Sequence, residues 1–460
     1  MCGVVGISGV ENAAQQAFLA MYALQHRGQE AGGIVAFDGE DGRLHKGSGL
    51  VSEIFDPESL EGLSGSTAIG HVRYSTAGGS DPANIQPITA RYRLGDLALA
   101  HNGNLTNQRA LRTSLVEDGA IFSSSSDSET LVHLIAKSRA KTVDDQVMDA
   151  LSHLSGAFSM ALVVGGKLYA ARDPRGFRPL MLGRKDNGHV VVSETCALDI
   201  LGATYLRDLE PGEVVRIESN QVHEVGRLDT APQPAPCIFE LVYFARPDSS
   251  LWGESVDRAR RAFGRQLAKE HPIRADAVIA VPDSANSAAL GYAEESGIPF
   301  ELGLLRNHYV GRTFIKPEQK DRDFGARMKY NPVRDVLAGK RVVVVDDSLV
   351  RGTTSRSLVR MLKAAGATEV HFRIGSPPVK FPCFYGIDMP TKGELIGSTL
   401  DVHEIEKRLG VDSLGYLSLE GMVRSVGQAG PYCTACFSGR YPAPLVDVEE
   451  GLASEDGPAL

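Results

Sequence analysis

Two groups of residues in this chain have the types and the spacing of reactive sites. The first is at the start, where removal of Met1 would leave Cys2 with a thiol beside a free α-amino group. An amine with an ordinary pKa of about 8 can accept the proton of a thiol with a pKa of about 8.5, so nucleophile and base would share one residue. The alternative is an ordinary free cysteine at the second position.

The second group lies in the run from Arg341 to Thr354, RVVVVDDSLVRGTT. The pattern predicts a buried strand that ends in Asp346 and Asp347 and continues through a loop into a helix. Such a loop can bind a phosphate through its N–H groups, its hydroxyls and the helix N-terminus, and the two carboxylates can bind ribose hydroxyls and Mg²⁺. An acidic strand end before an ordinary helix cap is the alternative, but the complete pattern favours a phosphate site.

The composition limits the possible partners and the compartment. The 460 residues contain 48 Lys and Arg against 57 Asp and Glu, without a basic block, which argues against nucleic acid as the main partner. No apolar run approaches the roughly 18 residues of a membrane span, and no signal-peptide pattern is present, so we expect a cytoplasmic protein without a membrane partner. Six cysteines in a reducing compartment indicate metal binding or catalysis rather than disulfides.

A proline-rich stretch at 231–236 separates two different patterns of predicted secondary structure. Before it, short apolar or alternating runs predict mostly antiparallel sheets with a few packed helices, of which two are placed at 12–24 and 128–140. After it, buried strands alternate with helices, which predicts a parallel sheet covered by helices. Proline cannot continue a helix or a central strand, so this stretch is expected to be a linker. The predicted parts are an α+β domain over 2–231, an α/β domain with a C-terminal helical extension over 237–443, and an acidic, flexible tail over 444–460.

The run from Asp346 to Thr354 closely resembles the phosphoribosylpyrophosphate (PRPP) loop of type I phosphoribosyltransferases. The resemblance implies that the acidic pair binds the ribose hydroxyls and Mg²⁺, and that the loop after it binds the 5′-phosphate. The implied PRPP-binding residues are Asp346, Asp347, Ser348, Arg351, Gly352, Thr353 and Thr354.

Two upstream segments resemble further parts of the same family. VPDSANSAA, at 281–289, resembles its pyrophosphate loop, which implies that Ser284 joins Asp346 and Asp347 around Mg²⁺; taken alone, this turn would be only a helix cap. The basic stretch at 306–331 resembles the flexible lid that covers the substrate, with an exposed charged loop as the alternative. The candidate lid contacts are Arg312, Lys316, Lys320 and Arg322.

The first half resembles the class II glutamine amidotransferases, which are N-terminal-nucleophile hydrolases with an αββα sandwich. The resemblance implies that Cys2 attacks the side-chain amide of glutamine and that Asn102 and Gly103, in HNG, form the oxyanion hole. It also implies three glutamine-binding residues, which are Arg73 for the α-carboxylate, Asp127 for the α-ammonium, and Arg27.

Each of these residues, considered alone, also has an ordinary structural interpretation. Arg73 could form a surface ion pair, Asn102-Gly103 could form a type I′ hairpin turn, and Asp127 could be a helix N-cap. Their joint occurrence in this order argues against coincidence.

Four of the six cysteines take part in neither predicted reaction, namely Cys237, Cys383, Cys433 and Cys436. A CxxC pair with two single cysteines can hold either a [4Fe–4S] cluster or a tetrahedral zinc ion, and the spacing favours neither. Cys196 has no partner in this scheme and is expected to be a small buried residue.

The pairing of a glutaminase half with a PRPP half resembles the glutamine PRPP amidotransferase family. In one branch of that family, cysteines in these contexts ligate a [4Fe–4S] cluster, which implies a structural cluster here. The resemblance further implies transfer of ammonia from glutamine to C1 of PRPP, which yields 5-phosphoribosylamine, glutamate and pyrophosphate in the first committed step of purine biosynthesis. It also implies a homotetramer with purine nucleotides as feedback effectors. The rival interpretations are a regulatory protein that senses PRPP or purines and a glutaminase that serves another phosphoribosyl reaction.

Overall fold

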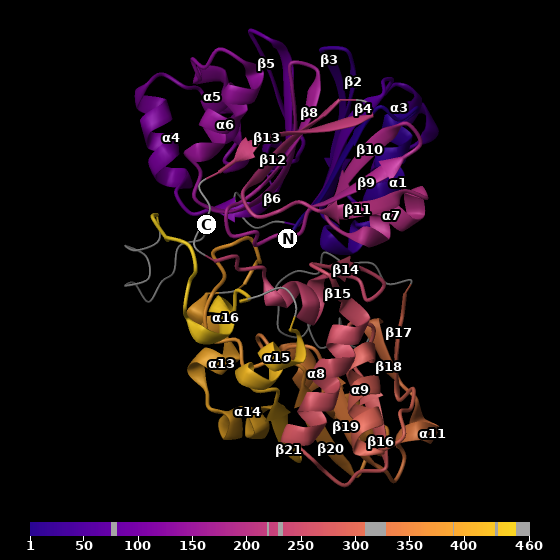
Figure 1. Ribbon diagram of the computed structural model, residues 1–460. Helices are drawn as coiled ribbons and strands as arrows, with labels where there is room; N and C mark the ends of the chain where they lie inside the picture. Colours follow the sequence, from indigo (N-terminus) through magenta and orange to yellow (C-terminus); the bar gives the residue numbers. More distant parts are fainter. Residues whose placement is uncertain are drawn as a thin grey trace.

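The computed structural model describes residues 1–74, 81–218, 220–228, 233–308, 328–389, 391–427 and 431–447. They form an N-terminal domain of two antiparallel sheets and a C-terminal domain around a parallel sheet, which are the upper and lower parts of Figure 1. This architecture confirms the predicted fold class. Part of the predicted linker, 231–232, lies outside the described residues, and 233–236 belong to no helix or strand.

The N-terminal domain contains a seven-stranded and a six-stranded sheet, in the orders β11-β9-β10-β1-β4-β2-β3 and β13-β12-β8-β7-β6-β5. The first sheet consists of β1 (Gly3–Ser8), β2 (Ala31–Asp38), β3 (Asp41–Ser48), β4 (Thr67–Arg73), β9 (Met181–Lys185), β10 (Gly188–Val192) and β11 (Thr204–Asp208). The second consists of β5 (Ile88–Tyr92), β6 (Gly95–Leu105), β7 (Gly156–Val164), β8 (Lys167–Arg172), β12 (Glu213–Glu218) and β13 (Gln221–Arg227).

Helices cover the outer faces of both sheets, and apolar side chains fill the space between them. Between the sheets, Val4 and Ile69 pack with Ala98 and Ala161. Helices α1 (Ala13–Ala23) and α7 (Thr195–Leu201) cover the first sheet, and α5 (Ser128–Lys137) and α6 (Val143–Ser152) cover the second, with α4 (Gln108–Glu117) beside α5. The shorter elements are η1 (Gln25–Arg27), α2 (Val51–Ile54), α3 (Pro57–Glu61) and η2 (Pro82–Asn84). The αββα sandwich implied by the family resemblance is therefore present.

Both helices that the sequence places in this domain are confirmed, and further helices accompany them. The two expected helices are α1 and α5, but α4, α6 and α7 are also formed. In α4 only Leu115 is buried, so this helix contributes little to the apolar core.

The C-terminal domain is built on four parallel strands in the order β16-β19-β20-β21. They are β16 (Ala277–Ala280), β19 (Arg341–Asp346), β20 (Glu369–Ile374) and β21 (Ser413–Tyr416). Successive valines of β19 point to opposite faces. Val343 packs towards α8 (Val256–Glu270) and α9 (Asn286–Ser296), and Val344 packs towards α12 (Thr353–Ala364) and α14 (Val402–Leu409). The predicted helix-covered parallel sheet is confirmed.

Several short elements complete the C-terminal domain. They are η3 (Glu240–Phe244), β14 (Ser250–Leu251), β15 (Glu254–Ser255), β17 (Leu304–Arg306), β18 (Tyr330–Pro332), α11 (Arg334–Leu337), η4 (Lys392–Glu394), α13 (Ile396–Thr399), α15 (Leu419–Ser425) and α16 (Ala435–Ser438). Among the described residues, no helix has the length and apolar composition that a bilayer crossing requires.

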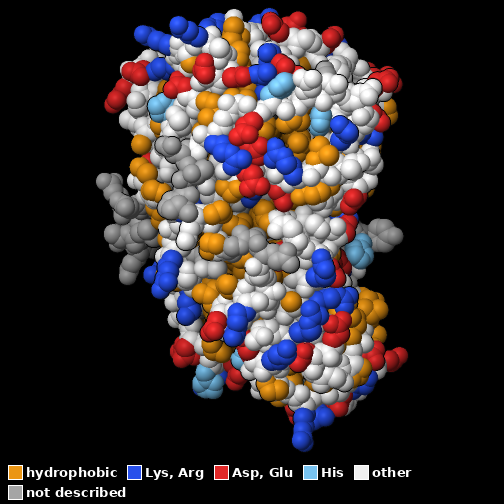
Figure 2. All heavy atoms as spheres, in the orientation of Figure 1, with side chains coloured by type: hydrophobic (Ala, Val, Ile, Leu, Met, Phe, Trp, Pro, Cys, Tyr) orange, Lys and Arg blue, Asp and Glu red, His pale blue; other side chains and the backbone are white. Residues whose placement is uncertain are grey.

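The two domains share a buried apolar junction. One continuous cluster contains Met21 of α1 and Phe263 of α8, together with Leu241 of η3. On the face shown in Figure 2, hydrophobic side chains reach the surface near this junction, and basic and acidic side chains are interspersed over both domains. Because the junction is packed like a core, we expect the two domains to behave as one body.

The segment after α16 returns to the N-terminal domain, as Figure 1 shows in yellow. The Thr106 hydroxyl donates to Pro444 O (2.8 Å), and the Asp447 carboxylate accepts from the backbone N–H of Arg109 (2.5 Å) and of Ala110 (3.2 Å). The predicted flexible tail thus begins with an anchored segment, because Asp447 satisfies free N–H groups at the start of α4. Residues 448–460 lie outside the described residues.

Candidate active sites

Cys2 lies at the start of β1, where it contacts both sheets of the N-terminal domain. Its side chain is buried, with Sγ 3.6 Å from Tyr74 O, and its backbone N–H donates to Asn102 Oδ1 at 3.1 Å. Met1 is also buried, and burial lowers the pKa of its α-amino group to about 6, with Arg178 and Arg27 acting in the same direction. While Met1 is attached the nitrogen of Cys2 is an amide, so the predicted base requires removal of Met1.

Asn102 and Gly103 lie inside β6, opposite Ser159 and Phe158 of β7, so the hairpin-turn alternative is excluded. Cys2 fixes one end of the Asn102 side chain, and Asn102 Nδ2 is buried without a hydrogen-bond partner in the described part of the chain. A Cβ on Gly103 would lie 2.0 Å from Ala157 O, so only glycine fits. A buried N–H donor with no partner beside a thiol has the chemistry of an oxyanion hole.

Arg73 and Asp127 are also buried in this region. Arg73 ends β4 and is only 6% exposed, so the surface ion pair considered for it is wrong. Asp127 occupies the N-cap position of α5, but its side chain makes no capping hydrogen bond; its carboxylate accepts from Leu105 N–H (3.0 Å) at the end of β6 and from the Ser128 hydroxyl (3.1 Å). The Asp127 carboxylate is thereby fixed to Leu105, which lies three residues beyond Asn102 in β6. Residues 75–80, which follow Arg73 and Tyr74, lie outside the described residues.

Arg27 does not have the surroundings of a glutamine-binding residue, which corrects the role implied for it. Its guanidinium is fully buried and donates to Glu194 (2.5 Å), to both carboxylate oxygens of Glu240 (2.9 and 3.0 Å) and to Cys2 O (2.9 Å). Because these acceptors engage its N–H donors, Arg27 supports the backbone of Cys2 and does not offer its charge to a substrate.

Neither Glu194 nor Glu240 is predicted from the sequence as a site residue. Burial alone would raise the pKa of Glu194, but the charges and hydrogen bonds of His26 and Arg27 lower it well below its usual range. Its carboxylate also accepts from Arg246 N–H and the Ser249 hydroxyl of the C-terminal domain, both at 2.9 Å. An acidic residue inside the apolar run CIFELVYF at 237–244 is a signal that could have indicated a buried ion pair for Glu240.

The second candidate site lies at the carboxyl ends of β16 and β19. Because these strands are adjacent and parallel, the loops that follow them meet, and the Ser284 hydroxyl donates to the Asp347 carboxylate. The Ser348 hydroxyl donates to the same carboxylate at 2.6 Å, and Asp347 N–H donates to Asp346 Oδ1 at 2.9 Å. The structure therefore brings together Ser284, Asp346 and Asp347, as the sequence predicted.

The electrostatics of this acidic pair favour a cation. Burial raises the pKa of Asp346, and the charge of Asp347 raises it further. Burial also raises the pKa of Asp347, against the hydrogen bonds of Ser284 and Ser348. Adjacent buried carboxylates are costly unless a positive charge compensates them, and Mg²⁺ is commonly held by one or two carboxylates together with substrate phosphates.

The loop after Asp347 leads into α12. Gly352 has a φ of 75°, a conformation that favours glycine, and Thr353 and Thr354 are exposed at the first turn of the helix. Arg351 is half exposed and forms an ion pair with Glu394 at 3.2 Å. The candidate lid residues Arg312, Lys316, Lys320 and Arg322 lie outside the described residues.

The four remaining cysteines converge beside the junction of the domains. Cys237 and Cys433 pair through their backbones, and Cys436 O accepts from the N–H of Phe381 (3.0 Å), two residues before Cys383. No disulfide links them. Burial raises the pKa of Cys237 to about 11 and, with a contribution from the neighbouring cysteines, raises the pKa of Cys433 and Cys436. Cys196 is buried elsewhere, as expected.

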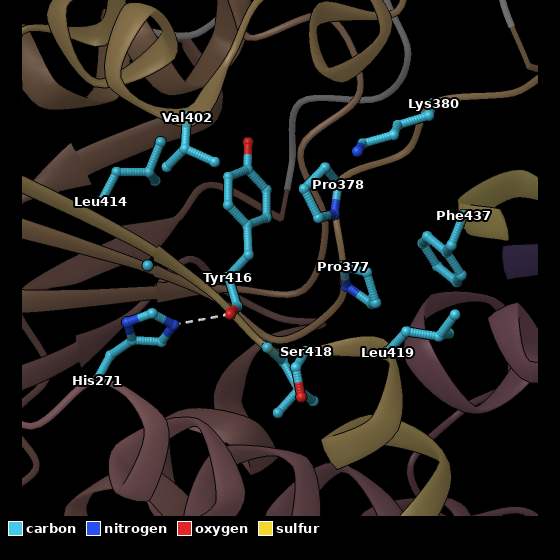
Figure 3. A pocket seen from close by; sticks show the side chains of 12 residues that line it. His271, Pro377, Pro378, Lys380, Val402, Leu414, Tyr416, Ser418, Leu419 and Phe437 are labelled. Atoms are coloured by element: carbon cyan, nitrogen blue, oxygen red, sulfur yellow. Dashed lines mark hydrogen bonds between the residues drawn. The ribbon is translucent and has the colours of Figure 1, made fainter.

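In the described part of the chain, no three His, Cys, Asp or Glu side chains are arranged as a ready metal site. A cavity of about 350 Å³ lies between Pro377, Pro378 and the end of β21, where His271 bonds to Tyr416 O at 2.9 Å (Figure 3). None of the predicted site residues line this cavity, so it belongs to neither candidate site.

Known proteins are similar to this chain both over the N-terminal domain and over nearly its full length. A family model described as a glutamine amidotransferase domain matches residues 71–199. The amidophosphoribosyltransferase of Bacillus subtilis is 50% identical over 450 residues, which are 96% of this chain and 94% of that protein. The chain belongs to the amidophosphoribosyltransferase family.

Two solved structures extend the match to the whole fold. One, described as the allosteric regulatory enzyme of purine biosynthesis, superposes with a TM-score of 0.92 at 50% identity and covers 96% of this chain and 97% of its own. Another, the glutamine PRPP amidotransferase of B. subtilis complexed with ADP and GMP, gives a TM-score of 0.91 at 48% identity and covers 96% and 98%. An Arabidopsis thaliana relative, 52% identical over 97% of this chain and 80% of its own, is named as chloroplastic.

Proposed function

We propose that this amidophosphoribosyltransferase, a glutamine-dependent pentosyltransferase of purine biosynthesis, uses the two sites described above for its two half-reactions. Glutamine and PRPP are converted to glutamate, 5-phosphoribosylamine and pyrophosphate. The observation that carries the assignment is the hydrogen bond from the backbone N–H of Cys2 to Asn102 Oδ1. It places the residue that bears the thiol beside Asn102, whose buried Nδ2 donor has no partner in the described part of the chain.

In the glutaminase half-reaction, Cys2 is the nucleophile after removal of Met1. Its α-amine, held by Asn102 Oδ1, accepts the thiol proton while Sγ attacks the amide carbon of glutamine. Asn102 Nδ2 and the N–H of Gly103 stabilise the oxyanion. The α-amine then returns the proton to the departing ammonia, and water releases glutamate from the thioester.

Three further residues complete this half of the site. Arg73 binds the α-carboxylate of glutamine as a charged fork, and Asp127 binds the α-ammonium. Both side chains are buried within the domain, so charged partners there interact more strongly than in water. Arg27 acts as a positioning residue through Cys2 O, not as a ligand of glutamine.

In the synthase half-reaction, ammonia attacks C1 of PRPP and pyrophosphate departs. The N-terminus of α12, with Ser348, Thr353 and Thr354, binds the 5′-phosphate. Asp346 and Asp347, with Ser284, would hold Mg²⁺ together with oxygens of the substrate. When bound, Mg²⁺ neutralises charge that develops on the departing pyrophosphate.

Cys237, Cys383, Cys433 and Cys436 are proposed to hold a [4Fe–4S] cluster with a structural role. The donor set fits because Cys237, Cys433 and Cys436 are buried, Cys383 is partly buried, and the proximity of Cys383 raises the pKa of Cys237 and of Cys436. Zinc is the alternative for such a set. Iron and acid-labile sulfide in the anaerobically purified protein would support the cluster, and one equivalent of zinc without sulfide would contradict it.

Regulation, assembly and location are part of the same proposal. A relative of the same fold has been solved with ADP and GMP, which supports purine nucleotides such as AMP and GMP as feedback effectors here. The proposed homotetramer rests on the family resemblance alone. A cytoplasmic location is supported by the six free cysteines, since reducing compartments keep thiols unpaired. The Arabidopsis relative's name shows that family members also occur in chloroplasts.

The experiment that tests the function measures glutamate and pyrophosphate released by the anaerobically purified protein with Mg²⁺, with and without PRPP. Equal amounts of both products, with glutamate release rising on addition of PRPP, are expected. Cys2→Ala should lose glutamine-dependent synthesis but retain synthesis from ammonia. Binding of PRPP without either product would instead favour the regulatory protein, and glutamate release that ignores PRPP would contradict the assignment of the C-terminal domain.

A further inference from the structure

A loop of the C-terminal domain, 383–387, lies against the strand that carries the proposed oxyanion donors. If Gly386 had a Cβ, that atom would lie 2.8 Å from the backbone carbon and oxygen of Gly103, so the two backbones are in direct contact. The side chain of Asn104, the next residue in β6, donates from Nδ2 to Phe384 O at 3.0 Å. Two separate contacts therefore join this loop to the end of β6.

The end of β6 needs such support because its sheet pairing is one-sided. β5 pairs with β6 only as far as Leu99, whereas β7 pairs with it from Ala98 to Leu105. In the described part of the chain, β7 is thus the only strand beside Asn102 and Gly103. A strand end held on one side has fewer constraints on the direction of its N–H groups than one held on both.

The loop itself is firmly held, so it can act as a support. The ring of Tyr385 stacks on Phe177 with centroids 4.2 Å apart, and Arg178 donates to Tyr385 O at 2.5 and 2.9 Å. The Tyr385 hydroxyl donates to Ala443 O at 2.7 Å and accepts from Ala443 N–H at 3.0 Å. Phe177 and Arg178 belong to the N-terminal domain, whereas Ala443 belongs to the C-terminal segment.

We propose that loop 383–387 is a positioning element for the oxyanion hole, which holds the peptide of Gly103 in the orientation that stabilises the tetrahedral intermediate. This inference rests on the proposed glutaminase site. It means that a segment of the PRPP-binding half sets the catalytic geometry of the glutaminase half. Because oxyanion stabilisation acts in the transition state, loosening the loop lowers kcat for glutamine and leaves the KM for glutamine largely unchanged.

The test compares Asn104→Ala with the matched control Asn107→Ala. Asn107 also donates from Nδ2 to a backbone carbonyl, His153 O at 2.8 Å, but this contact lies within the N-terminal domain. For Asn104→Ala we expect the glutamine-dependent kcat to fall roughly 10- to 100-fold, because misplaced oxyanion donors are costly. The KM for glutamine and the rate of synthesis from ammonia should stay within about twofold of wild type, since Asn104 contacts neither substrate.

Further readouts separate positioning from general damage. Alkylation of Cys2 by iodoacetamide, which forms no oxyanion, should proceed at the wild-type rate in Asn104→Ala. Gly386→Ala should show the same pattern more strongly where it folds, because its Cβ would press on Gly103. An Asn104→Ala enzyme that matches Asn107→Ala, or that loses glutamine- and ammonia-dependent synthesis equally, would overturn the proposal. A wild-type protein that releases no glutamate would instead overturn the proposed function.

Discussion

Replacement of Arg27 by methionine is expected to destabilise the protein by roughly 3–5 kcal/mol, because it removes the cation shared by two buried carboxylates and leaves them only His26, beside Glu194, and Arg178, 3.5 Å from Glu240. The side chains of Arg27, Glu194 and Glu240 are all 0% exposed. The guanidinium bridges the two carboxylates and also holds Cys2 O at 2.9 Å. Methionine has a similar length and is apolar, so the change removes the charge and the donors with little loss of volume.

The cost of this substitution depends on pH in a direction set by Glu194. In the wild-type protein the pKa of Glu194 is lowered by folding, so its contribution to stability is complete above the unfolded pKa of about 4.3 and is lost as the pH falls. In Arg27→Met, protonation of the Glu194 carboxyl removes the cost of burying its negative charge. The difference in unfolding free energy between the two proteins should therefore be full near pH 7 and shrink below about pH 5.

Urea unfolding followed by tryptophan fluorescence measures this difference at the junction. Trp252 is the only tryptophan in the sequence and lies between β14 and β15, with its ring 6.0 Å from the Arg172 guanidinium of the N-terminal domain. Arg91→Met is the matched control, because the ion pair of Arg91 with Asp41 is exposed and worth at most about 1 kcal/mol. A cost for Arg27→Met no larger than that of Arg91→Met at pH 7 would refute the reasoning.

Three further predictions, one of them with a control substitution, test other parts of the structure. Asp347→Asn should reduce pyrophosphate release from PRPP by at least about 100-fold, because it removes a charge from the proposed cation site; an unchanged Mg²⁺ dependence would contradict this. Cys436→Ser should lower the iron and sulfide content of the purified protein, whereas Cys196→Ser, at the buried cysteine outside the set, should not. Asp447→Ala should cost about 1 kcal/mol and speed hydrogen exchange at the Arg109 and Ala110 amides, because it removes a partner of the first turn of α4; unchanged exchange there would show that the tail contributes nothing.

Much of the fold and of the two sites could be predicted where the signal is local in sequence. Asp346, Asp347 and the α12 N-terminus follow one another along the chain, so the strand, loop and helix could be identified from one run of residues. The role of Arg27 could not, because one of its partners, Glu240, lies 213 residues away and no spacing relates the two. The contact of Gly386 with Gly103 was equally hidden, since a glycine shows in the sequence only that a side chain is absent.

These unpredicted contacts share one consequence for how the halves cooperate. Glu240, Gly386 and Asp447 all belong to the second half of the chain, and they contact Arg27, Gly103 and the start of α4, respectively. Each therefore supports a segment next to Cys2 or the end of β6. Coupling between the two reactions consequently needs no long relay through the N-terminal domain, because a local rearrangement of these contacts acts directly on the backbone beside the nucleophile and the oxyanion donors.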